Sequence, residues 1–230
     1  MTQTTQPTAL VTGASRGLGL ALARALLARG WLVVVDARRT DRLAVDLPGA
    51  IVVTGDVADP IHREALAAAV DALGRLDLLV NNASDLGPSP LPHLADYPLD
   101  ALRSVYETNV IAPLALLQLL LPQLRATSGA VLDISSDAAV EAYEGWGGYG
   151  SSKAALDHVS AVLAVEEPAI RVYAVDPGDM RTAMHQAAFP GEDICDRPEP
   201  ESVVPALLRL IAERPAGGRR RAADLRAVAP

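Results

Sequence analysis

The chain has 230 residues, half of them hydrophobic, with a formal net charge of -8 and a pI near 5.0. This length and composition allow one well-packed domain. An acidic surface repels phosphate backbones, which argues against a nucleic-acid partner. The only basic cluster, Arg219–Arg221, is expected to be a solvated or strand-edge feature.

Three features of the sequence indicate a soluble cytoplasmic protein. Cys195 is the only cysteine, so no intramolecular disulfide can form, as is typical of a reducing cytosol. The N-terminus, Met1–Pro7, is polar and does not resemble a secretory signal. The most apolar stretch, Val110–Leu121, is too short to span a bilayer. We therefore expect no membrane partner, and no metal site is predicted.

Strand and helix patterns alternate along the chain. Short apolar runs, expected to be strands, are separated by segments with apolar residues at helical spacing, around 18–26, 66–73, 99–125 and 156–163. Continuous apolar strands joined by helices predict a doubly wound parallel α/β sheet, the Rossmann fold, in a single domain over residues 1–230. The predicted strands are Ala9–Val11, Leu32–Val35, Ile51–Thr54, Leu76–Val80, Ala130–Ile134 and Ile170–Val175.

The last fifty residues are less regular. Gly178–Pro200 follows a predicted strand and has no clear period. We expect it to be a substrate loop over the carboxyl edge of the sheet, where ligands bind in this architecture. The tail after Gly217 is short, and the sequence leaves open whether it forms a seventh strand.

The first predicted strand runs directly into a glycine-rich segment, Thr12–Gly19, with the sequence TGASRGLG. Glycine allows a sharp turn and a close backbone approach, and the helix that follows offers its N-terminus to a pyrophosphate. With a strand before it and a helix after it, the segment predicts a dinucleotide site rather than a plain tight turn. The expected contacts are Gly13, Ser15, Arg16, Gly17, Leu18 and Gly19.

The Gly-x-x-x-Gly-x-Gly spacing resembles the classical short-chain dehydrogenase/reductase (SDR) family, and further motifs extend the resemblance to about Thr182. Asn81–Ser84 resembles the family's Asn-Asn-Ala-Gly segment, with Ser84 in place of glycine at a cost in backbone freedom. Without the resemblance, Asp56 fits an Asx turn and Pro177-Gly178 an ordinary turn. The cofactor contacts that the resemblance implies here are Asp56, Val57, Asn82, Ala83, Pro177, Gly178 and Thr182.

The end of the second strand bears on which nicotinamide binds. An acid in this region normally grips the ribose hydroxyls of NAD, and Asp36 is a candidate. The family's discriminating acid, however, falls on Ala37. A small residue leaves room for a phosphate, which Arg38 and Arg16 could pair with. We therefore expect NADP(H) to be favoured, with NAD(H) as the alternative. The alternative role for Arg38 and Arg16 is that they are ordinary solvated surface residues.

Tyr149 and Lys153 are four residues apart, so on a helix their side chains share one face. A nearby cation stabilises a phenolate and lowers its pKa toward working pH, where acid/base transfer is efficient. Lys153 is the only lysine beside 19 arginines, and arginine cannot replace a compact, tunable ammonium. The pair is typical of SDR catalysis and cofactor binding, and an exposed helix pair is the alternative.

Two further polar residues match catalytic positions of the family. Ser136 lies thirteen residues before Tyr149, the spacing of the serine that binds the substrate oxygen. Its neighbour Ser135 is a rival, and a strand-end cap is the plain alternative. Asn109 is a poor residue for the interior of the predicted long helix. The resemblance implies that it links a water to the lysine, whereas a buried, helix-bending amide is the alternative.

The substrate side is less well defined by the sequence. The helix through Leu114–Leu121 is apolar on more than one face, so it is either fully buried or packs on another subunit. Together with the resemblance, this predicts a homodimer or homotetramer. Substrate contacts are expected among Ser136, Glu141, Tyr143, Trp146, Met180, Met184 and Phe189.

These observations predict an NADP(H)-preferring oxidoreductase that interconverts a small-molecule ketone or aldehyde and an alcohol by hydride transfer, with Tyr149 as the general acid/base. Two alternatives share the fold. One is a non-catalytic dinucleotide sensor, and the other is an epimerase or dehydratase that keeps its nicotinamide bound.

Overall fold

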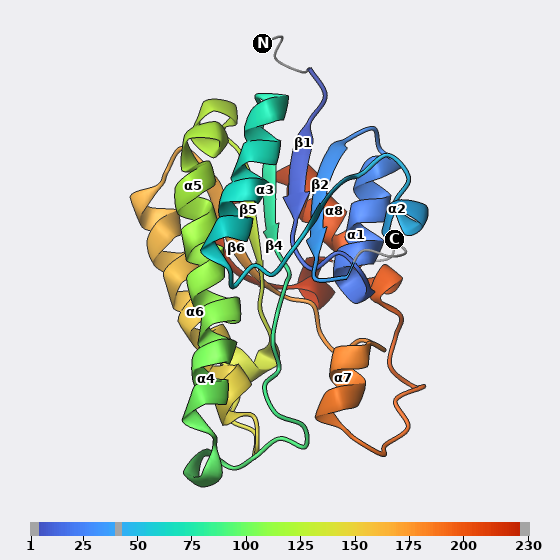
Figure 1. The fold of residues 1–230 in the computed structure, drawn as a ribbon, viewed down its shortest axis with the longest axis vertical. Coiled ribbons are helices and arrows are strands. Elements are labelled where there is room, and N and C mark those ends of the chain that lie inside the picture. Colours follow the sequence, from blue (N-terminus) through green and yellow to red (C-terminus); the bar gives the residue numbers. More distant parts are fainter. Residues whose placement is uncertain (1–4, 40–42, 226–230) are drawn as a thin grey trace.

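The computed structural model describes residues 5–39 and 43–225. Its centre is a seven-stranded parallel sheet in the order β3-β2-β1-β4-β5-β6-β7, which confirms the predicted doubly wound α/β fold in a single domain (Figure 1). The strands are β1 (Thr8–Val11), β2 (Leu32–Ala37), β3 (Ile51–Thr54), β4 (Leu78–Asn81), β5 (Ala130–Ile134), β6 (Arg171–Asp176) and β7 (Gly218–Arg221).

Helices cover both faces of the sheet (Figure 1). One face packs on α1 (Gly17–Leu27), α2 (Leu43–Asp46) and α8 (Val204–Glu213), and the other on α3 (Pro60–Leu73), α5 (Ala112–Thr127) and α6 (Gly147–Glu166). Because side chains alternate along a strand, Val33 and Val35 enter the first core and Val34 the second. The remaining helical elements are α4 (Leu99–Tyr106), α7 (Ala183–Ala188) and the single turns Leu94–Asp96, Asp137–Ala139, Pro200–Ser202 and Ala222–Leu225.

The predicted long helix over 99–125 is not one regular α-helix. A π-helical turn, η2 (Glu107–Ile111), separates α4 from α5. Together they form a helical stretch over Leu99–Thr127 that is long and apolar enough, by length and composition, to cross a membrane. The apolar run Val110–Leu121, too short by itself to span a bilayer, therefore lies within a longer helical stretch. Such a test is also passed by core helices, and Leu116, Leu120 and Leu124 are buried against the sheet.

The seventh strand that the sequence left open is formed. β7 pairs in parallel with β6 at the edge of the sheet, so the arginine cluster does lie on a strand edge. Arg219 is half-buried rather than fully solvated, because it pairs with Asp157 at 2.9 Å and with Asp176 at 3.7 Å. The fold thus ties its last strand to α6 by an ion pair.

The segment 178–200 is not an irregular loop throughout. It contains α7, whose N-cap Thr182 accepts a hydrogen bond from the backbone N–H of His185 at 3.1 Å. Ser89 also donates to the carbonyl of Ala187 at 2.7 Å, from the segment after β4. α7 lies beyond the carboxyl ends of the strands, at the bottom of Figure 1. The segment therefore lies at the edge of the sheet where its position predicted it.

Candidate active site

A single pocket at the carboxyl edge of the sheet collects most of the residues singled out in the sequence. It is lined by the glycine-rich segment, by the residues after β2 to β6, and by parts of α6 and α7. Of the predicted site residues, Gly19, Asn109, Glu141, Tyr143 and Phe189 do not line it. Those that do are Gly13, Ser15, Arg16, Gly17, Leu18, Asp36, Ala37, Arg38, Asp56, Val57, Asn82, Ala83, Ser135, Ser136, Trp146, Tyr149, Lys153, Pro177, Gly178, Met180, Thr182 and Met184.

The glycine-rich segment fits a pyrophosphate. Gly13 and Gly17 have φ of +66° and +59°, the left-handed region that favours glycine. A Cβ on Gly13 would lie 2.8 Å from Cα of Ala83, so the two backbones can approach only because glycine is there. The N-cap of α1 is Arg16, whose side chain does not cap the helix, and the first turn has no acidic residue. Backbone N–H groups at this helix end are therefore available to an anion.

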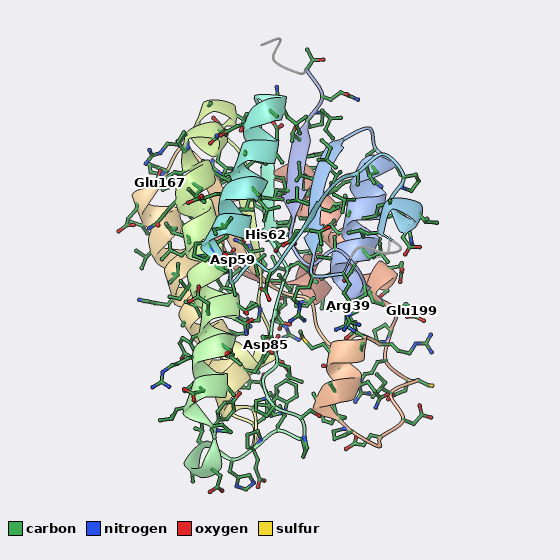
Figure 2. All side chains as sticks on the ribbon, in the orientation of Figure 1. Arg39, Asp59, His62, Asp85, Glu167 and Glu199 are labelled. Carbon is green, nitrogen blue, oxygen red and sulfur yellow. The ribbon has the colours of Figure 1, made fainter. Side chains whose placement is uncertain are left out.

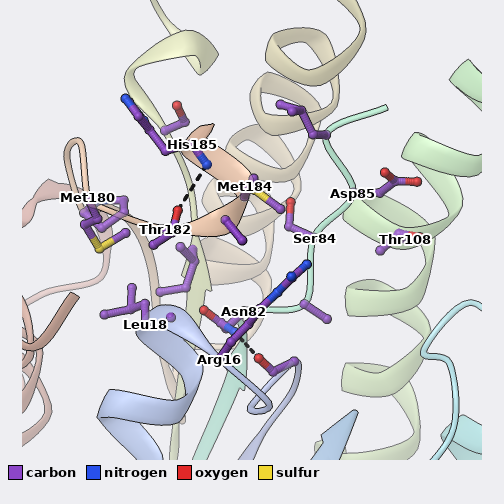
Figure 3. A pocket seen from close by; sticks show the side chains of 18 of the residues that line it. Arg16, Leu18, Asn82, Ser84, Asp85, Thr108, Met180, Thr182, Met184 and His185 are labelled. Carbon is purple, nitrogen blue, oxygen red and sulfur yellow. Dashed lines mark hydrogen bonds between the residues drawn. The ribbon is translucent and has the colours of Figure 1, made fainter. Parts of the chain in front are cut away.

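Asn82 holds the glycine segment in place. Its Nδ2 donates to the carbonyls of Thr12 at 2.8 Å and Gly13 at 3.1 Å. The hydroxyl of Thr12 in turn accepts from the backbone N–H groups of Asn82 and Ala83, both at 3.0 Å. Figure 3 shows Asn82 beside Arg16 at the floor of the pocket. The residues after β4 thus fix the loop that faces the ligand.

Asp36 lines the pocket, but its carboxylate is already engaged. It is 2% exposed, and its oxygens accept from the N–H of Gly13 at 2.6 Å and pair with Nε2 of His62 at 3.0 Å. Figure 2 shows His62 where α3 lies over the sheet. The sequence carried no signal for His62, because α3 brings it to β2 from 26 residues away. Ala37 is buried, whereas Arg38 is exposed at the pocket.

Tyr149 and Lys153 converge, as their spacing requires. Both lie on the buried face of α6, and Nζ of Lys153 is 5.6 Å from the centroid of the Tyr149 ring. Nζ also donates to the carbonyl of Ile134 at 2.7 Å. Burial lowers the pKa of Lys153 to about 8, against the opposing effect of Asp133 and Asp157.

The pKa of Tyr149 shifts in the direction opposite to the expectation. Burial raises it to about 12, and Asp137 and Asp176 add to the increase, while hydrogen bonds with Ser84 and Ser136 lower it. Desolvation of the phenolate therefore outweighs the neighbouring donors in the protein alone. At neutral pH the phenol is protonated and can act as an acid.

Ser136 lines the pocket, and it also caps the turn Asp137–Ala139 after β5, as the alternative of a strand-end cap predicted. Its Oγ accepts from the N–H of Ala138 at 3.2 Å and donates to Oδ1 of Asp137 at 2.9 Å. Ser135 lines the pocket as well, but it is only 2% exposed. Asp137 was not anticipated, although it follows the serine directly.

Asn109 is fully buried in the π turn and does not line the pocket. Its Oδ1 accepts from the Ser84 hydroxyl at 3.1 Å and from the N–H of Asp85 at 2.8 Å. Its Nδ2 donates to the carbonyl of Asp85 at 2.8 Å and to Oγ of Ser152 at 2.9 Å. Within the described residues its side chain bonds Ser84, Asp85 and Ser152, and the link to Lys153 through a water stays a prediction.

Aromatic and apolar side chains surround the phenol on the side away from the glycine segment. The Trp146 ring lies edge-on to Tyr149 at 5.8 Å and against Phe189 at 5.9 Å, between centroids. Met184 packs in the same cluster, and Figure 3 shows it and Thr182 on the α7 side of the pocket. Leu86 and His185 also line the pocket and were not anticipated, because side-chain direction decides their position.

The remaining predicted residues lie at the rim or in turns. Glu141 and Tyr143 are exposed and hydrogen-bonded to each other at 2.8 Å. Met180 lines the pocket but also packs on the first core. Asp56 forms the Asx turn that was the alternative to a cofactor contact, because it accepts from the N–H of Ala58 at 3.0 Å. It also lines the pocket. Gly178 has φ of +75°.

Known proteins share both the sequence and the fold. The short chain dehydrogenase family profile matches residues 7–193. Serine 3-dehydrogenase of Agrobacterium fabrum is 37% identical over 76% of this chain and 72% of its own length. L-xylulose reductase of Bos taurus is 34% identical over 90% and 89%. The structure of an alcohol dehydrogenase from Thermococcus sibiricus with 5-hydroxy-NADP aligns with a TM-score of 0.82 at 27% identity, covering 94% and 95%.

Proposed function

Because this chain belongs to the short-chain dehydrogenase/reductase family and is an NAD(P)-dependent oxidoreductase of alcohol and carbonyl groups, we propose that Tyr149 is its general acid/base and that it prefers NADP(H). The observation that carries the first part is the convergence of the buried phenol and the buried ammonium of Lys153 on one pocket. No other lysine exists in the chain to take that place.

Ser136, Tyr149 and Lys153 have different roles in the proposed proton transfer. A reduced nicotinamide, when bound, supplies the hydride, and its oxidised form adds positive charge near the phenol. Ser136 holds the substrate oxygen by turning its hydroxyl away from Asp137, and Tyr149 transfers its proton to that oxygen. The ammonium of Lys153 donates one N–H to the carbonyl of Ile134. Its other two N–H groups can donate to the cofactor ribose and toward the phenol of Tyr149. Since the pKa of Tyr149 is raised in the protein alone, its phenol is protonated at neutral pH, the form that donates a proton to a carbonyl oxygen.

The test is a turnover assay of the parent and Tyr149→Phe with NADPH or NADP. The panel includes L-xylulose and serine, taken from the names of the relatives. We expect the variant to lose at least about a hundred-fold in kcat, the usual contribution of a positioned acid/base. Tyr106→Phe, on α4 outside the pocket, is the matched control. Normal turnover by Tyr149→Phe would refute this role.

The same assay separates the alternatives that share the fold. An epimerase or dehydratase would convert substrate without net change in the reduced cofactor, and its nicotinamide would copurify. A pure sensor would bind cofactor tightly and turn over nothing in the panel. Net consumption of NADPH, coupled one to one with alcohol formed, supports the oxidoreductase and excludes both.

The preference for NADP(H) is supported by the end of β2. Both carboxylate oxygens of Asp36 are engaged, by Gly13 and by His62, and the residue is 2% exposed, so little of it is open to the ribose hydroxyls that identify NAD. Arg16 and Arg38 are exposed at the pocket and form no ion pair with the described residues. Guanidinium groups suit a ribose phosphate. Arg38→Ala should weaken NADPH binding about ten-fold and NADH binding little, whereas Arg29→Ala, in the turn after α1, should change neither.

The substrate half of the pocket is proposed to be Ser136, Trp146, Met180 and Met184, with segment 178–200 as the substrate loop and Glu141 and Tyr143 at the rim. The support is that α7 packs its apolar side chains against Tyr149 and Trp146. Such a wall suits a small-molecule carbonyl or alcohol with an apolar substituent. A cytoplasmic location is also proposed, which the exposed free thiol of Cys195 fits.

A homodimer or homotetramer is proposed as the assembly. α4 and α5 lie end to end, and α6 runs beside them on one flank of the molecule (Figure 1). They leave several large apolar side chains exposed, which a second copy of the chain could cover. These residues are Leu99, Ile111, Leu119, Val162 and Val165.

A further inference from the structure

β7 carries three consecutive arginines, Arg219–Arg221, to which the proposed function gives no role. Neighbouring side chains differ in their partners, because successive residues of a strand point to opposite faces. Arg220 donates within its own segment, to the carbonyls of Ala216 at 2.8 Å and Arg219 at 3.2 Å. Arg219 instead reaches across the end of β6 to the segment after β5, where its Nη2 donates to the backbone carbonyl of Ser136 at 2.9 Å. Arg219 therefore links the edge strand to the pocket.

The guanidinium of Arg219 is held between two acidic side chains. Its Nε donates to Oδ2 of Asp157 on α6 at 2.9 Å, and its Nη2 lies 3.7 Å from Oδ2 of Asp176 at the end of β6. Both carboxylates are largely buried, and neither forms an ion pair with another cation among the described residues. A guanidinium is planar, so these two contacts also restrict the direction in which it donates to Ser136.

Ser136 receives this hydrogen bond at its backbone. Its hydroxyl bonds within the turn Asp137–Ala139, which the residue itself caps. Its carbonyl accepts from the N–H of Ala139 at 3.2 Å and from the Ser135 hydroxyl at 3.5 Å. The bond from Arg219 is shorter than both, is charge-assisted and comes from another element of the fold. The position of this peptide matters, because misplacing a substrate-binding group by about 1 Å can cost about a hundred-fold in rate.

We propose that Arg219 is a positioning residue for the substrate oxygen: it holds the carbonyl of Ser136 and so fixes the residue whose hydroxyl binds that oxygen. The inference rests on the proposed function, because it takes Ser136 to bind the substrate oxygen beside Tyr149. Arg219 does not line the pocket. It therefore acts through Ser136, and no proton passes to it or from it. The last strand of the sheet would then have a part in catalysis as well as in the fold.

The first experiment compares the parent, Arg219→Met and Arg220→Met in reduction of the panel substrate that the parent turns over fastest. Arg219→Met removes the donor and the charge but keeps an unbranched apolar stem. Fluorescence titration measures the NADPH bound at saturation, and kcat is divided by that amount, so that unfolded protein does not count. In Arg219→Met we expect kcat per bound NADPH to fall about ten-fold, with Kd for NADPH nearly unchanged. Arg220→Met, the same change at the next residue of β7, should match the parent.

The second experiment, hydrogen exchange followed by mass spectrometry, needs no substrate. The N–H groups of Ala138 and Ala139 bond to Ser136 itself, so their exchange reports how firmly that residue is held. Segment 136–140 should exchange faster in Arg219→Met than in the parent or in Arg220→Met. Arg219→Lys keeps a charge beside the two carboxylates but loses the planar pair of donors. Its exchange and its kcat should therefore lie between those of the parent and Arg219→Met.

An unchanged kcat per bound NADPH in Arg219→Met would overturn the inference, and so would unchanged exchange at 136–140. An equal loss in Arg220→Met would also overturn it, because a general disturbance of β7 would then explain both. If Arg219→Met binds no NADPH, the same two measurements on Arg219→Lys decide, and parent values there would overturn the inference. Failure of the proposed function is distinct, since Tyr149→Phe would then turn over normally whatever the exchange at 136–140 shows.

Discussion

Lys153 combines a charge with 1% exposure, and that combination has a cost in stability. Burial lowers its pKa from 10.5 to about 8. A base with a lowered pKa is protonated in both states below pH 8, so the folded state bears the full burial cost there. Between pH 8 and 10.5 the unfolded state binds more protons, and the stability of the fold rises with pH. The shift corresponds to about 3 kcal/mol.

We predict that Lys153→Met loses at least about a hundred-fold in turnover but no stability at pH 7. The variant no longer buries a charged ammonium, which stabilises it. This gain offsets the cost of leaving the carbonyl of Ile134 without a donor, about 1–3 kcal/mol. In urea unfolding at pH 7 and 9.5, the parent should gain stability relative to the variant as pH rises. A pH-independent difference between the two proteins would contradict the lowered pKa. Lys153→Arg, which stays charged, should be less stable than the parent at both pH values.

At the level of single residues, the sequence predicted members of the site better than their contacts. Tyr149 and Lys153 were predictable because helical spacing alone places them on one face. Asp36 was ambiguous because its partner, His62, lies on another element. The raised pKa of Tyr149 was not predictable, since burial follows from tertiary packing. Ser84 looked like a mere departure from a motif until its hydroxyl could be placed against Asn109.

Pairing between elements also determines how the cofactor loop is held. The His62–Asp36 contact at 3.0 Å joins α3 to β2. Asp36 in turn accepts a hydrogen bond from the N–H of Gly13 at 2.6 Å, so the position of Gly13 depends on this contact. A ring nitrogen and a backbone N–H are the partners of this buried carboxylate. Removing one of them leaves a charge that is desolvated and underpaired.

We predict that His62→Phe lowers the free energy of unfolding by about 2–3 kcal/mol and weakens NADPH binding about ten-fold, because Gly13 loses its rigid acceptor. His62→Gln retains a donor near Nε2 and should recover part of both losses. Thermal unfolding and NADPH fluorescence titration provide the measurements, with His158→Gln, exposed on α6, as the control. Binding by His62→Phe equal to that of the parent would show that Asp36 does not set the loop.

Elements with a strong apolar pattern were predictable, and those without one were not. Strands β1 to β6 are mostly apolar and lie within two residues of their predicted ends. β7 is Gly-Arg-Arg-Arg, stabilised by the Arg219–Asp157 ion pair instead of apolar burial, so no pattern indicated it. α7 has only six residues, too few for a period. The π turn at 107–111 keeps the chain helical between α4 and α5, so helical spacing over 99–125 does not reveal it.

For the molecule as a whole, the open question is what covers the flank formed by α4, α5 and α6. Val165 on α6 is 81% exposed and Leu119 on α5 is 41% exposed, although both belong to helices whose other faces fill the second core. Single exposed apolar residues are ordinary on any surface. Several on neighbouring helices of one flank are surface that a second copy could cover, and a stable dimer buries about 1,200–2,000 Å².

We therefore predict that the parent is a dimer or larger at micromolar concentration, and that Leu119→Glu combined with Val165→Glu shifts it to a monomer. Two buried, unpaired carboxylates would cost several kcal/mol at such an interface, enough to dissociate it. Light scattering after size-exclusion chromatography measures the mass directly. Val45→Glu, 77% exposed on α2 at the other side of the sheet, carries the same change and should leave the mass unchanged. A monomeric parent would show that there is no such interface, and dissociation by Val45→Glu would place the interface elsewhere. Neither result would affect the pocket, because it is built within one chain.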